Sequence, residues 1–471
     1  MYCVRATVVL RPRDRRDQPR SCVTGKDAAG GATAQSLPLA ALARRGQVAA
    51  GFGEFAAMQA AAGVVLAGWM ALAVLATVGC AWTLHLLRRP QPWPVVQPPV
   101  LVVVPVRGPA PGLAAFLDAL AAQDHPAWRV VFAVEAPADP AYPALARFAA
   151  ADPARATVVI AGPALRRGQK VQNLLAGLNA LRPDDAALVT LDADMVPPPG
   201  LLSALLRPLL TGQGAIATGY RWTLPGTSNA VPAMLALAEM GIATLPRWSR
   251  LPLCWGGATA IGRAALARLD LRTVWDRAVS DDLALTRTAR QAGLLVYAPL
   301  TVRPPSLVAP DLAGALAFGE RQYRLLRWHS PGVWWLAGGL LGLPALGAVV
   351  ALAAGGPALG CLGAALLLAR LRARLRARIA ARVLPPDAAA LAARTLRRGL
   401  WLAAPAHALH LSAWLRSGFG RDLHWAGRCY RLDGTGMVET VTPCPAPGPA
   451  RGPAASSLQQ RHRQPGERRA Q

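Results

Sequence analysis

Two aspartates stand directly after an apolar run in the middle of this 471-residue chain. The segment AALVTLDAD (186–194) has the character of a buried strand, and Asp192 and Asp194 follow its carboxyl end. In open α/β sheets, ligands bind at this end of the strands. Two carboxylates placed two residues apart can reach one hard cation, Mg²⁺ or Mn²⁺, that bridges substrate phosphates. The alternative is a polar turn before Pro197.

A second acidic pair follows Ser280 and leads into the helical pattern LALTRTARQAG. A carboxylate here could act as a base that removes a proton from a hydroxyl. The alternative is structural, because Ser280 can cap a helix whose N-terminal dipole favours Asp281 and Asp282.

Lys170, in GQKVQNL (168–174), goes against the composition of the chain. Lys26 is the only other lysine, so 51 − 2 = 49 of the basic residues are arginine. A compact ammonium suits a phosphate oxygen or a tight pocket better than a solvated surface. Chance retention of a lysine is the alternative.

Paired glycines follow a tryptophan in LCWGGAT (253–259). Gly256 and Gly257 would let the backbone approach a ligand closely, and Trp255 would stand beside it on the acceptor side. The alternative is a tight turn in the core.

The segment RLLRW (324–328) lies just before a long apolar block. Arg324 and Arg327 could form a cationic site for a diphosphate leaving group, with the Trp328 indole as an apolar platform. The alternative is a belt of arginine and tryptophan at a membrane interface.

Short apolar runs that alternate with helical patterns must position these residues. The runs are VLVVVPV (100–106), WRVVFAV (128–134), ATVVIAG (156–162) and AALVTLDAD (186–194). Continuous apolar strands separated by helices predict a mostly parallel, Rossmann-like sheet covered on both faces. We therefore expect one α/β domain over residues 91–330.

Apolar runs on both sides of this domain predict membrane helices. Residues 58–90 contain an uncharged run long enough to span a bilayer. Residues 331–436 offer Trp334–Ala354, a short run at Ala358–Leu368 and a weaker one at Gly399–Leu415, so we expect about four spans. Between the last two, an apolar stripe at 368–383 is flanked by arginines and predicts a basic interfacial helix. Residues 1–57 and 437–471 are expected to be disordered.

Composition excludes several classes of protein. Charged residues make up 16% of the chain and hydrophobic residues 53%, which argues against a mostly disordered chain and against a wholly soluble enzyme. The net charge is +26, but no nucleic-acid motif occurs, and many arginines lie beside apolar runs as in cytoplasmic loops. The seven cysteines are far apart without zinc spacing, which predicts scattered thiols in a reducing compartment.

Charge also bears on topology. Arg88 and Arg89 follow the first span and favour a cytoplasmic catalytic domain. Residues 1–57 carry nine basic residues on the other side, which conflicts with that orientation. Translation that begins at Met58 would remove the conflict.

Taken together, the motifs resemble the membrane-bound family 2-type glycosyltransferases with their D, DxD, D, (Q/R)xxRW signature. They are more similar still to the ceramide glucosyltransferase branch and its bacterial relatives, including hopanoid-associated glycosyltransferases. The resemblance covers about residues 60–436. The segments that carry it are VVVPVRG (102–108), AVEAPADPA (133–141), GQKVQNL (168–174), LDADMVPP (191–198), WGGATAIGR (255–263), SDDLALTR (280–287), RQYRLLRW (321–328) and WAGRCYRL (425–432).

This resemblance implies a GT-A fold, a UDP-sugar donor, a divalent cation and an inverting transfer of one sugar to a membrane lipid such as ceramide, diacylglycerol or a hopanoid. It implies that Asp192 and Asp194 hold the metal and donor and that Asp282 is the base. Arg324, Arg327 and Trp328 would form the terminal motif. The expected location is a bacterial inner membrane, with the catalytic domain in the cytoplasm.

The chain departs from the family pattern at Ala136, where the first aspartate should fall. Glu135 and Asp139 are nearby, and Glu135 is the expected donor-binding substitute. Two rival functions remain: a processive polysaccharide synthase of the same superfamily, and an inactive membrane scaffold. The sugar, the lipid, the metal and the oligomeric state are not fixed by the sequence.

Overall fold

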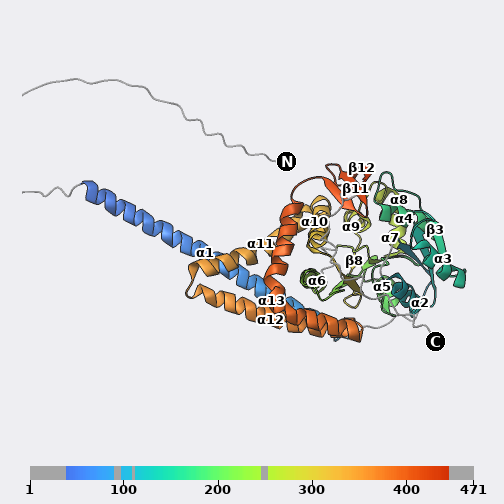
Figure 1. Ribbon diagram of the computed structural model, residues 1–471, viewed down its shortest axis with the longest axis horizontal. Coiled ribbons are helices and arrows are strands. Elements are labelled where there is room, and N and C mark those ends of the chain that lie inside the picture. The colour runs from blue at the N-terminus through green and yellow to red at the C-terminus, as the bar shows by residue number, and fades with distance from the viewer. Residues whose placement is uncertain (1–38, 90–96, 109–111, 246–252, 445–471) are drawn as a thin grey trace, which may run out of the picture. The chain divides into compact units, whose positions relative to one another are not determined.

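The structure is a computed structural model that describes residues 39–89, 97–108, 112–245 and 253–444. Its centre is a seven-stranded sheet in the order β3-β2-β1-β4-β7-β5-β8 (Figure 1). The strands are β1 (Val100–Pro105), β2 (Trp128–Val134), β3 (Ala156–Ile160), β4 (Ala187–Leu191), β5 (Ile216–Thr218), β7 (Ala258–Gly262) and β8 (Val296–Tyr297). The four strands expected from the apolar runs are all present, and they are parallel to one another.

The second half of the sheet changes direction at β7, which is antiparallel to both β4 and β5. This reversal places the start of β7 beside the end of β4, with Leu191 opposite Ala258. The glycine pair before β7 is thereby brought to the aspartates that follow β4.

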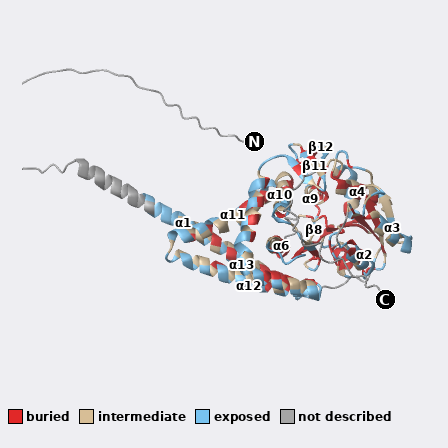
Figure 2. Cartoon of the chain, in the orientation of Figure 1, coloured by how far each residue is buried: buried red, intermediate tan, exposed pale blue. Residues whose placement is uncertain are grey.

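Helices cover both faces of the sheet, as the apolar strands require. Alternate residues of β1 point to opposite faces. Val102 belongs to a core shared with Phe116 and Leu205, whereas Val103 belongs to one shared with Leu174 and Leu285. The central strands are accordingly buried in Figure 2. The helices of this part are α2 (Leu113–Ala121), α3 (Tyr142–Ala151), α4 (Gln169–Gly177), α5 (Leu201–Leu210), α6 (Ala230–Ala243), α7 (Arg263–Arg268), α8 (Leu271–Val274), α9 (Asp281–Gln291) and α10 (Leu312–His329), with the 3₁₀ turn η1 (Leu178–Ala180) after α4.

Two smaller sheets complete the fold. β6 (Trp222–Pro225) and β9 (Pro305–Val308) form a parallel pair. β10 (Asp422–Trp425), β11 (Arg428–Leu432) and β12 (Val438–Pro443) form an antiparallel sheet at the C-terminal end. The expectation of disorder from residue 437 onward is therefore wrong for residues 437–444, because Val438–Pro443 form β12 and Val438 is buried. Residues 445–471 lie outside the described part of the chain.

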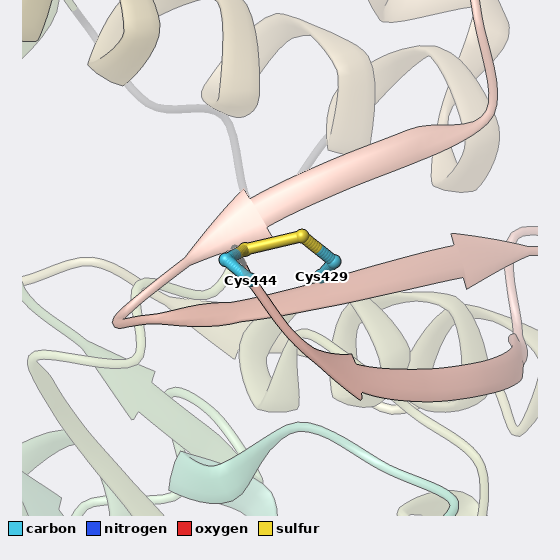
Figure 3. Close-up of a disulfide and its surroundings, with 2 residues drawn as sticks. All are labelled: Cys429 and Cys444. Atoms are coloured by element: carbon cyan, nitrogen blue, oxygen red, sulfur yellow. A yellow bond between two sulfur atoms is a disulfide. The ribbon is translucent and has the colours of Figure 1, made fainter. Parts of the chain in front are cut away.

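The free-thiol expectation is corrected for one cysteine pair. Cys429 on β11 and Cys444 just after β12 form a disulfide (Figure 3). Strand pairing brings them together, since Cys444 donates its backbone N–H to Gly427 O at 3.1 Å. Among the described residues, Cys80, Cys254 and Cys361 form no disulfide. The sequence showed no spacing from which the pair could have been identified.

Long helices carry the apolar blocks. They are α1 (Leu39–Leu86), α11 (Pro331–Ala354), α12 (Ala358–Val383) and α13 (Pro386–Ser417). Residues 39–57, expected to be disordered, are helical, in keeping with their many alanines and leucines; residues 1–38 lie outside the description. Within the described ranges, two helices are long and apolar enough to cross a membrane: Ala56–Leu86 and Pro331–Ala354.

The remaining two expected spans lie inside α12 and α13, whose arginines keep these helices below the same criterion. The stripe at 368–383 is the second half of α12 rather than a separate helix. Its members Leu375, Ile379 and Val383 pack in a core with α6 and β6, so these side chains face protein and not lipid. A helix shows the same amphipathic periodicity whether its apolar face is buried against protein or in lipid, so the sequence could not distinguish the two cases.

Candidate active site

Four segments far apart in the sequence meet beyond the end of β4. Asp192 follows this strand, and its backbone N–H donates to Gly257 O at 3.0 Å. The N-terminus of α4 supplies Lys170, and the N-terminus of α9 supplies Asp281 and Asp282. Of the residues predicted from motifs, these are the ones that the fold brings closest together.

Lys170 joins the two acidic motifs. Its Nζ lies 2.8 Å from Asp192 Oδ1 and 3.3 Å from Asp281 Oδ1. Although burial alone lowers it, these carboxylates raise the pKa of Lys170 above its ordinary value, so the ammonium is charged. Burial raises the pKa of Asp192 to about 7 against the opposing effect of Lys170, and Asp194 and Asp281 add to the rise. The site thus holds more carboxylates than cations.

Gly256 closes the cluster and leaves no room for a side chain. A Cβ at this position would lie 2.5 Å from Asp281 Oδ2 and 2.7 Å from Lys170 Nζ. Gly257 is equally tight because its Cβ would fall against the Trp255 ring. The expected close backbone approach is real, but at Gly256 the approaching groups are the ion pair itself. The acceptor-side role of Trp255, Gly256 and Gly257 remains a prediction.

Asp282 is held in one orientation. Its Oδ2 accepts the Gly256 N–H at 3.0 Å, and its Oδ1 accepts the Leu283 N–H at 2.8 Å and the Ser280 hydroxyl. Ser280 also caps α9, so the structural alternative for this motif holds as well. The Asp281 side chain is 5% exposed and forms an ion pair with Lys170, whereas Asp282 is only partly buried. Asp282 is therefore the more accessible of the two carboxylates.

Glu135 lies at the end of β2 and is already paired. Its two oxygens meet Arg107 Nε at 3.4 Å and the Arg428 guanidinium. Asp139 anchors the turn nearby by accepting the Gly108 N–H at 2.9 Å. The donor-binding role of Glu135 thus remains a prediction. Both of its carboxylate oxygens already have an arginine partner.

Arg428 is a residue that the motif analysis passed over as a site residue. It lies on β11 and contacts Glu135 and, at 3.3 Å, Ala164 O. Tyr430 on the same strand accepts the backbone N–H of Gln169, next to Lys170, at 3.3 Å. Arg428 lies in WAGRCYRL (425–432), one of the segments that carry the family resemblance, and that signal could have marked it as a candidate site residue.

The RLLRW motif is divided by the fold. Trp328 packs with Val279 and Leu283 on either side of the acidic pair. Arg324 donates to Asp422 O and pairs with Glu320, and Arg327 donates to Gly418 O and, at 2.7 Å, to Gly420 O. These two arginines hold the link between α13 and β10, so their contact with a diphosphate remains a prediction.

His329 follows Trp328 and was also missed. Neither ring nitrogen has a hydrogen-bond partner among the described residues, and the side chain is buried. Burial, with a smaller contribution from Arg287, lowers the pKa of His329 to about 4, against the opposing effect of Asp282. A neutral imidazole therefore stands within electrostatic reach of the proposed base.

The donor set around β4 fits a divalent cation. Asp194 is exposed, and Asp192 stands in an excess of negative charge. Two carboxylates are enough for Mg²⁺, which keeps waters and takes further oxygens from substrate phosphates. Asp192 and Asp194 are the residues that would hold the ion.

A mostly parallel sheet of the GT-A type, with paired aspartates after a central strand, defines a nucleotide-sugar-dependent glycosyltransferase. The chain belongs to glycosyl transferase family 21, whose profile matches residues 68–438. The mostly parallel sheet confirms the expected fold class, and the profile match confirms the expected family. No curated protein matches the sequence.

Several solved structures resemble the chain at low identity. The mannosyltransferase PcManGT from Pyrobaculum calidifontis, in complex with GDP-mannose and Mn²⁺, is 20% identical; the match covers 74% of this chain and 99% of that one, with a TM-score of 0.41. Glucosyl-3-phosphoglycerate synthase from Mycobacterium tuberculosis, with Mn²⁺, UDP and glucosyl-3-phosphoglycerate, is 20% identical over 49% and 80%, with a TM-score of 0.32. TarS residues 1–349 from S. aureus is 12% identical over 71% and 96%, with a TM-score of 0.33.

Proposed function

We propose that this family 21 enzyme transfers one sugar from a UDP-sugar, with inversion, to a hydroxyl group of a membrane lipid such as ceramide, diacylglycerol or a hopanoid. The observation that carries the proposal is the cluster of Lys170, Asp192 and Asp281 with Asp282 beside it. This cluster brings together the Lys170 ammonium and the accessible carboxylate of Asp282 near the end of β4. Asp192 in the cluster and Asp194 next to it are the two candidate metal ligands.

In the proposed reaction, Asp282 accepts the proton of the acceptor hydroxyl as its oxygen attacks the anomeric carbon. The bond from that carbon to the donor diphosphate breaks, and UDP leaves with the electron pair. Attack from the face opposite UDP converts an α-linked donor into a β-glycoside. A divalent cation at Asp192 and Asp194 would supply charge stabilisation to the departing diphosphate.

Lys170 positions this machinery. Its ion pairs fix Asp192 relative to α9, so the metal ligand and the base keep a constant separation. Precise placement of reacting groups is a large source of catalytic power. Trp328 and Leu283, the residue after Asp282, pack against the same apolar cluster, which includes Val279 just before α9.

A lipid acceptor is supported by the short distance in sequence between the site and an apolar helix. Trp328 lies near the end of α10, and α11 begins at Pro331. Within the described residues, two helices are apolar enough to cross a membrane, which leaves little material for a polymer channel and disfavours the synthase alternative. The retained acidic residues disfavour the inactive scaffold.

We further propose that the catalytic domain lies on the cytoplasmic side of a bacterial inner membrane, because Arg88 and Arg89 follow the first apolar run. The Cys429–Cys444 disulfide stands against this orientation, since disulfides are rare in the cytoplasm. The redox state of this pair in cells is therefore an independent test.

The direct test is transfer by the purified full chain in detergent. UDP-glucose and UDP-N-acetylglucosamine are each supplied with ceramide, diacylglycerol or hopanoid acceptors, and products are identified by mass spectrometry. We expect a lipid that carries a single hexose or N-acetylhexosamine. Long product ladders, or transfer to soluble acceptors alone, would overturn the assignment.

A further inference from the structure

Arg321 on α10 differs from the other arginines near the end of its helix. Arg324 and Arg327 give their N–H groups to backbone carbonyls and to Glu320. In the ranges that the structure describes, no carboxylate pairs with Arg321 and no hydrogen bond holds it. Its guanidinium instead lies 5.3 Å from the centre of the Phe318 ring and 5.2 Å from that of Trp425.

A second cation stands next to it. The Arg221 guanidinium lies 4.8 Å from the centre of the same Phe318 ring, and it is neutralised by Glu239 at 3.3 Å. Burial, followed by the charge of Arg221, lowers the pKa of Arg321 to about 10, so the group is still charged at neutral pH. A partly buried cation without a counter-charge costs free energy, and an anion supplied from outside would remove that cost.

The two arginines lie beside the proposed transfer site. Tyr220, the residue before Arg221, has its ring 5.7 Å from that of Trp255, which precedes Gly256. Although burial alone lowers it, Glu239 and Asp194 are among the groups that raise the pKa of Arg221. Arg221 is thus within electrostatic reach of a proposed metal ligand.

We propose that Arg321, flanked by Phe318 and Trp425 and backed by Arg221, is a phosphate-binding subsite next to the transfer site. A guanidinium binds phosphate oxygens through two parallel N–H groups, and stacking on aromatic rings fixes its plane. Arg321 begins the segment RQYRLLRW (321–328), but the RLLRW residues to which a diphosphate role was assigned begin three residues later at Arg324.

The inference rests on the proposed function, and it names two sources of the same chemistry. One is a phosphate in the head group of a phospholipid acceptor such as phosphatidylglycerol, in addition to the phosphate-free acceptors proposed above. The other is the diphosphate of the donor. Either ligand would place its charge where the described chain supplies none.

The test uses the purified full chain with Arg321→Gln and Arg321→Lys, and with Arg290→Gln as the matched control because Arg290 is exposed on α9. One arm measures the affinity for UDP and for inorganic pyrophosphate by calorimetry. The other measures sugar transfer to phosphatidylglycerol and to diacylglycerol in mixed micelles. Thermal unfolding of each variant is recorded. If Arg321→Gln does not fold, both the affinity and the transfer measurements are made on Arg321→Lys.

We expect Arg321→Gln to lose about tenfold to a hundredfold in one arm, the range for one charged hydrogen bond, and Arg321→Lys to lose less. A fall in UDP and pyrophosphate affinity assigns the site to the donor. A fall confined to phosphatidylglycerol, with diacylglycerol unchanged, assigns it to the acceptor. If both arms match the Arg290→Gln control, the subsite is wrong. If the wild type binds UDP but glycosylates no lipid, the proposed function fails, and the first arm still judges the subsite.

Discussion

Lys170 Nζ lies 2.8 Å from Asp192 Oδ1, and this contact ties the first turn of α4 to the residue that follows β4. The same ammonium reaches Asp281 at the start of α9. One side chain therefore sets the spacing between the proposed metal ligand and the segment that carries the proposed base.

The first prediction concerns that side chain. Lys170→Arg keeps the charge, but the larger guanidinium does not fit beside Gly256, whose Cβ position is 2.7 Å from Nζ. We expect a loss of about a hundredfold in transfer rate from misplacement of the acids, measured as UDP release in the presence of acceptor. A fully active Lys170→Arg enzyme would make the residue incidental.

The two acids of α9 should behave differently. Asp282→Asn removes the proposed base and should lower the rate by about a hundredfold to ten-thousandfold with UDP affinity unchanged. Because the asparagine NH₂ group would face one of the donors that Asp282 accepts, we also expect a loss of about 1 kcal/mol in stability. Asp281→Asn removes one of the two carboxylates that hold Lys170 while Asp192 remains, so we expect it to lower stability by about 1–3 kcal/mol. An inactive, normally stable Asp281→Asn enzyme beside an active Asp282→Asn enzyme would reverse the assignment.

Gly256→Ala should be inactive because its methyl group would lie 2.5 Å from Asp281 Oδ2. Overpacking of this kind costs about 1–3 kcal/mol, and here it also displaces the ion pair. The matched control is Gly332→Ala, where a Cβ meets nothing within 4 Å. Equal activity of the two variants in the transfer assay would remove Gly256 from the site.

Removal of divalent cations should stop turnover. We expect EDTA to abolish transfer and excess Mg²⁺ or Mn²⁺ to restore it, since Asp192 and Asp194 offer oxygen ligands. Asp194→Asn should weaken Mn²⁺ binding, measured by paramagnetic relaxation, as well as activity. Full turnover in a metal-free preparation would exclude this role.

The cysteine pair on the C-terminal sheet reports on membrane orientation. If the catalytic domain faces the cytoplasm, we expect Cys429 and Cys444 to be reduced in living cells and to close on purification in air. Trapping with a thiol reagent before lysis, followed by mass spectrometry, measures this. A pair already oxidised in cells would place the domain on the other side.

The sequence predicted the parallel half of the sheet closely because β1 to β4 are short, continuous apolar runs, which are typical of strands covered on both faces. The positions of Asp192 and Asp282 at a strand end and a helix start followed from the same patterns. The contact of Arg428 with Glu135 did not, since it joins residues almost three hundred positions apart. The prediction that the stripe at 368–383 is a separate interfacial helix was wrong for another reason. An amphipathic helix has the same periodicity whether its apolar face packs on protein or on lipid.

The contact between Arg428 and Glu135 also constrains how the chain is threaded. Glu135 precedes α11, and Arg428 follows α13, so if the α11–α13 block is embedded in a bilayer, both of its ends must emerge on the same face. The number of crossings within the block would then have to be even. If α11 crosses, one later helix must return, and the first half of α12, which packs on α11 through Ala351 and Ala365, is the segment placed to do so.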